Sequence, residues 1–252
     1  MTDLSIILPT LNEQENIKPL IAQITAALIG YSYEIIIVDD RSADGTADVV
    51  FSLTKNNPSL LLICRQGEKG LSASVVDGFS VAKSKILAVM DADLSHDARL
   101  LPGFIQGIRE GNDMVIGSRY MKGGGADHWP WFRRFTSYIA TVLAIELFRL
   151  PMKDPMSGFF AVRKDVFVRA QASLNPMGYK ILLELFLRGQ VKSIKEIPFI
   201  FKDRKQGHSK LSSRVASQYL LMLFHLRHYI WAFHLLRKIF HAGSSSHHSS
   251  SY

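Results

Sequence analysis

The chain has 252 residues, of which 47% are hydrophobic, so it is long enough to bury the core of one large domain. Its formal net charge of +8 implies anionic partners, which can be nucleic acid, a membrane surface or phosphorylated small molecules. The single Cys64 excludes an intrachain disulfide and fits a reducing, intracellular compartment, and the first residues lack the basic and apolar regions of a signal peptide.

Strand and helix patterns alternate along the first half of the chain. Apolar runs of strand length are separated by segments with the repeat of an amphipathic helix. The predicted strands are 4–9, 33–38, 60–64, 85–90 and 113–117, and the predicted helices are 17–28, a helix through 46–50 capped by Ser42 and Asp44, 71–83 and 100–109. This order predicts an α/β fold with a doubly wound, mostly parallel sheet. Because Cys64 ends an apolar run, we expect it to be a thiol of the core.

Acidic residues follow three of these strands. Glu13 comes after the first, Asp39 and Asp40 after the second, and Asp91-Ala92-Asp93 after the fourth. The carboxyl ends of the strands meet at one edge of a doubly wound sheet, so we expect these side chains to converge. The last pair can hold a divalent cation whose other ligands are substrate phosphates and water. The first three carboxylates can accept hydrogen bonds from a base and a ribose, so the pattern predicts an enzyme that uses nucleotide sugars.

Two other nucleotide-binding motifs are missing from the sequence. The first strand is not followed by G-x-G-x-x-G, and no G-x-x-x-x-G-K-[ST] occurs. Dinucleotide-dependent dehydrogenases and P-loop enzymes are therefore disfavoured.

Six motifs occur in an order that resembles one family. They are Pro9-Thr-Leu-Asn-Glu13, Asp39-Asp-Arg-Ser-Ala-Asp-Gly-Thr46, Met90-Asp-Ala-Asp-Leu-Ser-His96, Gly117-Ser-Arg-Tyr120, Asp154-Pro-Met-Ser-Gly-Phe159 and Gly207-His-Ser-Lys-Leu211. From about residue 4 to 211 the chain resembles the dolichol-phosphate (polyprenol-phosphate) mannosyltransferases of inverting glycosyltransferase family 2, which have the GT-A fold. One departure is Arg41, where many relatives have glycine.

The resemblance implies roles for particular residues. Those bordering the nucleotide would be Pro9, Leu11, Glu13, Asp39, Asp40, Asp91 and Ala92. Asp91 and Asp93 would hold Mg²⁺ or Mn²⁺ against the diphosphate of the donor, which in this family is GDP-mannose.

The resemblance also implies an acceptor site for a polyprenyl or dolichyl phosphate. Arg119, Arg133 and Ser137 match positions that bind the acceptor phosphate, and the i, i+4 spacing of the last two presents both to one anion. Arg204 and Lys210 match a lid that closes on the diphosphate. The acceptor phosphate is already largely ionised at neutral pH, so it can attack without a general base and invert the anomeric carbon. We therefore assign no role to His96 or His208, which we expect to be solvated.

The second half of the chain combines basic and apolar residues, which favours a membrane surface over nucleic acid. The apolar stretches 135–145 and 215–226 are too short to cross a bilayer. We expect residues 1–211 to form the catalytic domain, 212–241 an amphipathic segment at the cytoplasmic face of a membrane, and 242–252 a disordered tail. Trp129 and Trp131 are candidate interfacial anchors. Many relatives carry transmembrane helices after this domain, so a separate membrane subunit is a candidate partner.

Several alternatives remain open at this stage. A sister enzyme with a UDP-sugar donor fits the same carboxylates, because these do not distinguish guanine from uracil. Asp39 and Asp40 could merely cap a helix, Arg119 and Arg133 could be ordinary surface cations, and the apolar C-terminal helices could pack in a core or a dimer interface. A basic protein that binds nucleic acid or scaffolds a membrane is a third hypothesis, but acids on its binding edge would repel nucleic acid.

Overall fold

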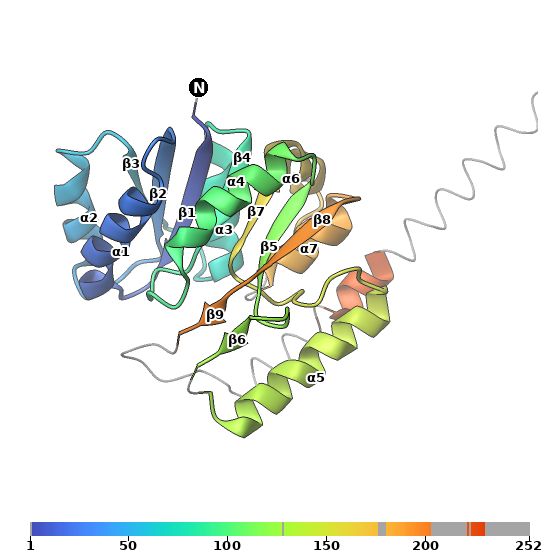
Figure 1. Cartoon of the computed structure of the whole chain (residues 1–252). Coiled ribbons are helices and arrows are strands. Elements are labelled where there is room, and N and C mark those ends of the chain that lie inside the picture. Colours follow the sequence, from blue (N-terminus) through green and yellow to red (C-terminus); the bar gives the residue numbers. More distant parts are fainter. Residues whose placement is uncertain (1, 128, 176–179, 203–220, 222, 230–252) are drawn as a thin grey trace, which may run out of the picture. The chain divides into compact units, whose positions relative to one another are not determined.

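The computed structural model describes residues 2–127, 129–175, 180–202, 221 and 223–229 (Figure 1). The chain divides into two units, Met1–Ser209 and Lys210–Tyr252. The strands and helices labelled in Figure 1 all belong to the first unit. In the second unit the described residues are helical.

Seven strands of the first unit form one mixed sheet in the order β3-β2-β1-β4-β7-β5-β8. Their bounds are β1 Leu4–Thr10, β2 Tyr33–Asp39, β3 Leu60–Cys64, β4 Ile86–Val89, β5 Met114–Ser118, β7 Phe160–Arg163 and β8 Ile194–Pro198. β7 runs antiparallel to both of its neighbours, and every other pair is parallel. This arrangement confirms the predicted α/β fold with a mostly parallel sheet.

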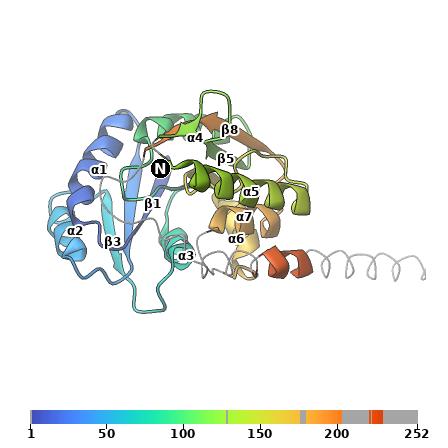
Figure 2. The same cartoon turned by 90° about the horizontal axis from the view of Figure 1, so that it is seen from below.

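Helices cover both faces of the sheet, with α1 and α4 on one face and α3, α6 and α7 on the other (Figure 2). The bounds are α1 Gln14–Ala27, α2 Thr46–Thr54, α3 Leu71–Val81, α4 Leu101–Arg109, α6 Lys164–Gln171 and α7 Ile181–Arg188. A short 3₁₀ helix, Ala98–Leu100, precedes α4. Because both faces are covered, the central strands are apolar along almost their whole length. Ile6, Ile7 and Leu8 of β1 are completely buried.

A close helix-to-strand contact fixes α3 on the middle of the sheet. A Cβ atom at Gly78 would lie 2.7 Å from Cγ2 of Ile7. Any larger residue would therefore push α3 away from β1. This contact matters for function because the loops that precede α3 lie at the carboxyl edge of β2 and β3.

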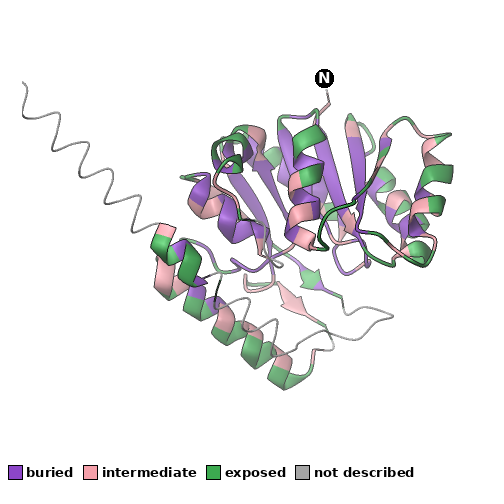
Figure 3. Cartoon of the chain, turned by 180° about the vertical axis from the view of Figure 1, so that it is seen from behind, coloured by how far each residue is buried: buried purple, intermediate pink, exposed green. Residues whose placement is uncertain are grey.

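A second, two-stranded parallel sheet joins β6, Gly125–Ala126, to β9, Ile200–Phe201. The long helix α5, Trp131–Phe148, begins shortly after β6 and has much of its surface exposed (Figure 3). Among the described residues, no helix is long and apolar enough to cross a membrane.

Two local predictions were wrong. Cys64 is exposed, because it is the last residue of β3, the edge strand of the sheet. Helix α2 starts after Gly45, whose φ of 89° is the left-handed conformation that glycine adopts at no steric cost. Asp44 does accept a hydrogen bond from the Thr46 N–H, 3.0 Å away, whereas Ser42 contacts Asp39 instead of capping the helix.

Candidate active site

The carboxyl ends of β2, β1 and β4 lie next to one another, as the order of the sheet requires. Thr10 and Asp39 are register partners, and the Asp40 N–H donates to the Thr10 carbonyl at 2.9 Å. The structure therefore brings the ends of β1 and β2 together, and Asp91 and Asp93 follow the adjacent strand β4. The predicted convergence of carboxylates on one edge agrees with this geometry.

Asp91 and Asp93 differ in their surroundings. Asp93 is buried, and its Oδ1 accepts hydrogen bonds from the N–H of Ser95 at 3.1 Å and from the Ser95 hydroxyl. The Asp91 side chain is 21% exposed. Asp93 thus lies on the buried side of this loop, and Asp91 lies on its solvent side.

Gly158 lies close to the Asp91 side chain. A Cβ atom at Gly158 would lie 3.3 Å from Asp91 Oδ2, so a larger residue there would crowd the carboxylate. The described residues contain no group of three or more His, Cys, Asp or Glu side chains that could hold a metal. A pair of carboxylates is the ligand set with which Mg²⁺ or Mn²⁺ still takes substrate phosphate and water.

His96 is buried beneath this loop, so the expectation of a solvated histidine was wrong. Its Nδ1 accepts a hydrogen bond from the Asp91 N–H at 3.0 Å, and its Nε2 lies 3.8 Å from Asp91 Oδ2. The ring stacks on Phe159 with centroids 4.8 Å apart, and the edges of Phe199 and Phe201 close the pocket. His96 therefore supports the loop that carries Asp91 and Asp93.

Asp39 is engaged mainly with its own loop. Its Oδ1 accepts from the hydroxyls of Ser42 and Thr10, and its Oδ2 accepts from the Ser42 N–H at 2.9 Å. A carboxylate has about four acceptor positions, so these contacts use three of them. Asp39 shapes the turn that follows β2 and keeps little capacity for a ligand.

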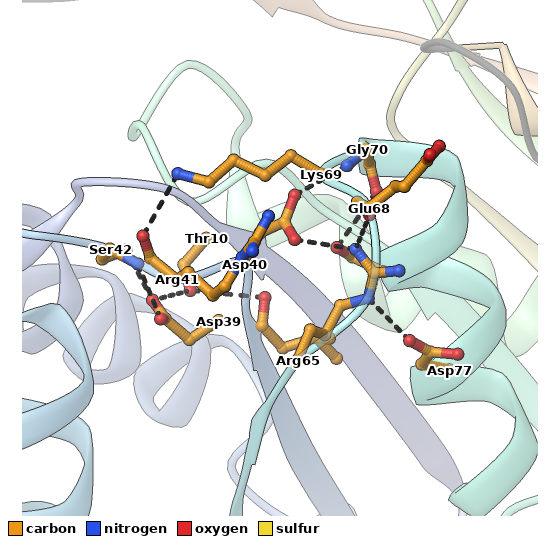
Figure 4. A network of polar contacts seen from close by, with 12 residues as sticks. Thr10, Asp39, Asp40, Arg41, Ser42, Arg65, Glu68, Lys69, Gly70 and Asp77 are labelled. Carbon is orange, nitrogen blue, oxygen red and sulfur yellow. Dashed lines mark hydrogen bonds and ion pairs between the residues drawn. The ribbon is translucent and has the colours of Figure 1, made fainter.

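Asp40 is held differently, between an arginine and a turn (Figure 4). Its Oδ1 accepts from Arg65 Nη1 at 2.7 Å and its Oδ2 accepts from the Gly70 N–H at 2.7 Å. These are the contacts that Asp40 makes with the described part of the chain, and they use two of its acceptor positions, so of the two neighbouring acids Asp40 has more capacity to bind a base.

Arg41 has a φ of 62°, the left-handed region that L-residues adopt at a cost of about 1–2 kcal/mol. Glycine, the residue that the resemblance leads us to expect here, adopts this conformation at no steric cost.

The remaining predicted nucleotide-binding residues follow β1. Pro9 lies within the strand, and Leu11 is 37% exposed just after it. Glu13 precedes α1, its N–H donates to Thr46 Oγ1 at 2.9 Å, and its Oε2 accepts from Asn16 at 2.7 Å. This contact with Thr46 ties the β1 loop to the β2 loop.

Arg119 follows β5 and forms a buried ion pair with Asp154. Its Nε and Nη2 donate to the two oxygens of Asp154, each at 2.8 Å, and its own N–H donates to Asp154 Oδ2 at 3.0 Å. Burial alone would lower the pKa of Arg119, but the Asp154 carboxylate offsets this and raises the pKa above its ordinary value. Arg119 is a permanent, oriented positive charge rather than a loose surface cation.

A cavity of about 320 Å³ opens beside this ion pair. It is lined by Arg119, Tyr120, Gly125, Ala126, Trp129, Arg134 and Tyr138. Two arginines among aromatic rings suit a ligand with an anionic head and an apolar tail.

Arg133 and Ser137 lie close to this cavity. The Arg133 guanidinium stacks on the Trp129 ring, 4.2 Å from its centroid, and Ser137 Oγ lies 3.0 Å from the Tyr120 hydroxyl. Arg134, which the sequence analysis did not single out, lines the cavity and donates to the Ala126 carbonyl at 2.8 Å. Trp129 is partly buried and packs against Phe201, whereas Trp131 is 78% exposed.

Lys180, just before α7, is a further cation that the sequence analysis missed. Burial lowers its pKa to about 8, and the charge of Arg119 adds to this shift, while Asp154 and Asp91 oppose it. The same lysine thus interacts electrostatically with Asp91 and with the Arg119–Asp154 pair.

Arg204 and Lys210, the predicted lid residues, lie outside the described residues, as do His208 and nearly all of the predicted interface segment 212–241. The last described residue before them is Lys202, whose N–H donates to the Ser95 carbonyl at 3.1 Å.

Comparison with known proteins identifies relatives along most of the chain. The sequence model of the family described as "Glycosyl transferase family 2" matches residues 5–169. A relative from Saccharomyces cerevisiae named dolichol-phosphate mannosyltransferase is 37% identical over 239 residues, which cover 91% of this chain and 88% of the relative. A relative of the same name from Pyrococcus furiosus is 42% identical over 225 residues, or 88% of this chain. The match spans 63% of that longer relative.

Solved structures share the fold at lower sequence identity. Glucosyl-3-phosphoglycerate synthase from Mycobacterium tuberculosis, in complex with Mn²⁺, UDP and phosphoglyceric acid, matches with a TM-score of 0.67 at 18% identity. That match covers 89% of this chain and 78% of the other. A structure of the same enzyme with Mg²⁺ and UDP also has a TM-score of 0.67. The predicted GT-A type of α/β fold is confirmed, and the chain belongs to glycosyl transferase family 2.

Proposed function

We propose that this protein transfers mannose from GDP-mannose to a polyprenyl or dolichyl phosphate, with inversion at the anomeric carbon. The observation that supports the proposal most strongly is the joint presence of a candidate cation site and a candidate phosphate site at one edge of the sheet. One is the carboxylate pair Asp91 and Asp93, and the other is the cavity beside the Arg119–Asp154 pair. The names of the relatives support the acceptor and the sugar.

On the donor side, Asp91 and Asp93 would hold Mg²⁺ or Mn²⁺, and the turn that carries Asp40 would bind the nucleoside. When bound, the cation would neutralise the diphosphate and stabilise it as a leaving group. Complexes of a structural neighbour with Mn²⁺ or Mg²⁺ support the use of a divalent cation. Arg204 and Lys210 would add positive charge from the lid.

On the acceptor side, Arg119, Arg133 and Ser137 would bind the lipid phosphate, and the aromatic rings of the cavity would contact the first part of its chain. The positive charges offset the repulsion between a dianionic nucleophile and an anionic donor. A phosphate oxygen that is already ionised needs no base, so its attack opposite the leaving diphosphate would convert an α-linked donor into a β-linked product. Proton NMR of the product tests this step, and an α-linked product would contradict it.

The second candidate is the same transfer from a UDP-sugar. The geometry of Asp40 fits this candidate equally well, because its remaining acceptor positions suit a base N–H of either guanine or uracil, and a structural neighbour is solved in complex with UDP. Transfer of radiolabel from GDP-mannose, UDP-glucose and UDP-N-acetylglucosamine to polyprenyl phosphate in detergent separates the two. Label from GDP-mannose alone supports the first proposal, and label from a UDP-sugar supports the second.

We also propose that the exposed face of α5 rests on the cytoplasmic surface of a membrane, so that the lipid tail stays in the bilayer. Trp131, Phe135 and Tyr138 are 78%, 57% and 56% exposed, and their spacing places them on one face of the helix. A separate membrane subunit could cover the same face. Nucleic acid is a poor candidate here, because the strand-end acids would repel it.

Replacing both Trp131 and Phe135 by serine is expected to weaken binding to phosphatidylcholine/phosphatidylglycerol vesicles by about tenfold or more, because two large apolar side chains no longer leave water. Vesicle flotation measures this binding. Phe51→Ser is the matched control, since Phe51 is an equally exposed phenylalanine, at 58%, on α2. Equal flotation of the wild type, the double variant and the control would contradict the membrane role.

Arg133→Ala is expected to raise the KM for polyprenyl phosphate by about tenfold, because a charge-assisted contact with the phosphate is lost. The KM for the donor should stay within about twofold, since Arg133 lies on the acceptor side. Steady-state kinetics with each substrate varied in turn gives both values. Arg109→Ala, a half-exposed arginine on α4, is the control. An unchanged acceptor KM would remove Arg133 from the phosphate site.

A further inference from the structure

Arg65 is a buried arginine between two carboxylates on different elements (Figure 4). It comes directly after β3, and its side chain is 7% exposed. Nη1 donates to Asp40 Oδ1 at 2.7 Å, and Nε donates to Asp77 Oδ2 at 2.6 Å. Asp77 belongs to α3, so one guanidinium links the end of β2 to that helix.

The same guanidinium also holds the turn that leads into α3. Arg65 Nη1 donates to the Glu68 carbonyl at 3.0 Å, and the Gly70 N–H donates to Asp40 Oδ2 at 2.7 Å. Both oxygens of Asp40 are therefore fixed, one by Arg65 and the other by a turn that Arg65 itself anchors. A change in the position of the guanidinium would move both contacts together.

The 68–70 turn also contacts Arg41, the residue that follows Asp40. Lys69 Nζ donates to the Arg41 carbonyl at 3.3 Å. Arg41 is held at a φ of 62°, a conformation that persists in a non-glycine residue only where its surroundings fix it. The arrangement from Arg65 to Lys69 thus supports the backbone on which Asp40 is carried.

Asp77 contacts Arg65 from the solvent-exposed side of α3. Its side chain is 48% exposed, and it reaches Asp40 through Arg65. The planar guanidinium donates in fixed directions, so a carboxylate on Nε sets the direction in which Nη1 points.

We propose that Arg65 and Asp77 form a positioning pair that orients the Asp40 carboxylate and the 68–70 turn for the nucleoside part of the donor. The inference rests on the proposed function, because it assumes that Asp40 borders a nucleotide. Neither residue needs to touch the sugar or the acceptor.

Calorimetric titration with GDP and with UDP, each in the presence of Mn²⁺, tests the pair without any turnover. For the nucleotide that the wild type binds, Asp77→Asn is expected to raise the Kd by about tenfold, because the charged partner of Arg65 Nε is lost. Arg65→Lys keeps the charge but loses the planar guanidinium that donates to Asp40 and Asp77 together, so it should have a similar effect. Pyrophosphate with Mn²⁺ should bind both variants as it binds the wild type, since the loop that carries Asp91 and Asp93 is untouched. Thermal unfolding confirms that each variant is folded.

Asp48→Asn is the matched control, because Asp48 is an exposed aspartate on the neighbouring helix α2 and the substitution changes the charge equally. Wild-type nucleotide affinity in Asp77→Asn would overturn the inference, and so would an equal loss in Asp48→Asn or an equal loss of pyrophosphate binding. Failure of the proposed function would look different, because the wild type itself would then bind neither nucleotide.

Discussion

Asp93→Asn is expected to lower the rate of sugar transfer by about 10³-fold while the chain stays folded. Asparagine has nearly the same volume and keeps an oxygen that can accept from the Ser95 N–H, so the loop retains its internal bond. What is lost is one of the two negative charges that would hold the cation. Transfer of labelled mannose at saturating Mn²⁺ gives the rate, and a Mn²⁺ titration in the presence of GDP gives the metal affinity.

The control for this substitution is Asp165→Asn on α6, where the carboxylate is 46% exposed and pairs with Arg163 and Arg169 at the surface. It should transfer sugar at the wild-type rate. If Asp93→Asn turns over like the wild type, or loses activity without losing Mn²⁺ affinity, the metal assignment is wrong.

Asp154→Ala is expected to destabilise the fold by about 3–5 kcal/mol, because the Asp154 side chain is completely buried and its removal leaves the Arg119 charge without its carboxylate. For a chain of this size that corresponds to a fall in Tm of about 10 °C. Transfer should also be lost, since Arg119 would no longer be held toward the cavity. Thermal unfolding followed by circular dichroism measures the first effect.

The double variant Arg119→Met/Asp154→Leu separates stability from activity. Two apolar side chains can replace a buried ion pair without leaving a charge behind, so part of the lost stability should return. Full recovery is not expected, because the Arg119 N–H loses its acceptor at Asp154. Transfer to the lipid phosphate should stay absent. An active double variant would show that Arg119 does not bind the acceptor.

The sheet and the edge that carries the site were predictable from the sequence, because they follow from local periodicity. The apolar runs at β1, β2 and β3 lie within one residue of the observed bounds, and the rule that ligands gather at carboxyl ends then placed Asp40, Asp91 and Asp93. The antiparallel strand β7 was not predicted, since its four residues follow a long irregular segment and carry no alternating pattern.

The supporting residues were not predictable, because burial depends on packing between distant segments. From the sequence, His96 was expected to be a solvated loop residue, but Phe159, Phe199 and Phe201 pack around its ring and bury it. Cys64 looked like a core residue because an edge strand has the same apolar run as a central one. Such assignments need the order of the strands, which a single sequence does not contain.

The sequence contains indications of the roles of Arg65 and Asp154 that the sequence analysis did not recognise. Arg65 follows directly after a predicted strand, the position at which only acids were sought. Asp154 opens the motif Asp-Pro-Met-Ser-Gly-Phe, but its partner Arg119 lies 35 positions away. A search for cations at strand ends would have found Arg65, whereas pairing Asp154 with Arg119 requires the fold.

The most direct test is the transfer of labelled mannose from GDP-mannose to polyprenyl phosphate, compared with the unphosphorylated polyprenol, with Mn²⁺ and with a chelator. Our account predicts label in the lipid phase only with polyprenyl phosphate and only with the cation, because the phosphate is the nucleophile and two carboxylates alone cannot stabilise the leaving diphosphate. Equal labelling of the polyprenol, or undiminished transfer in chelator, would contradict it.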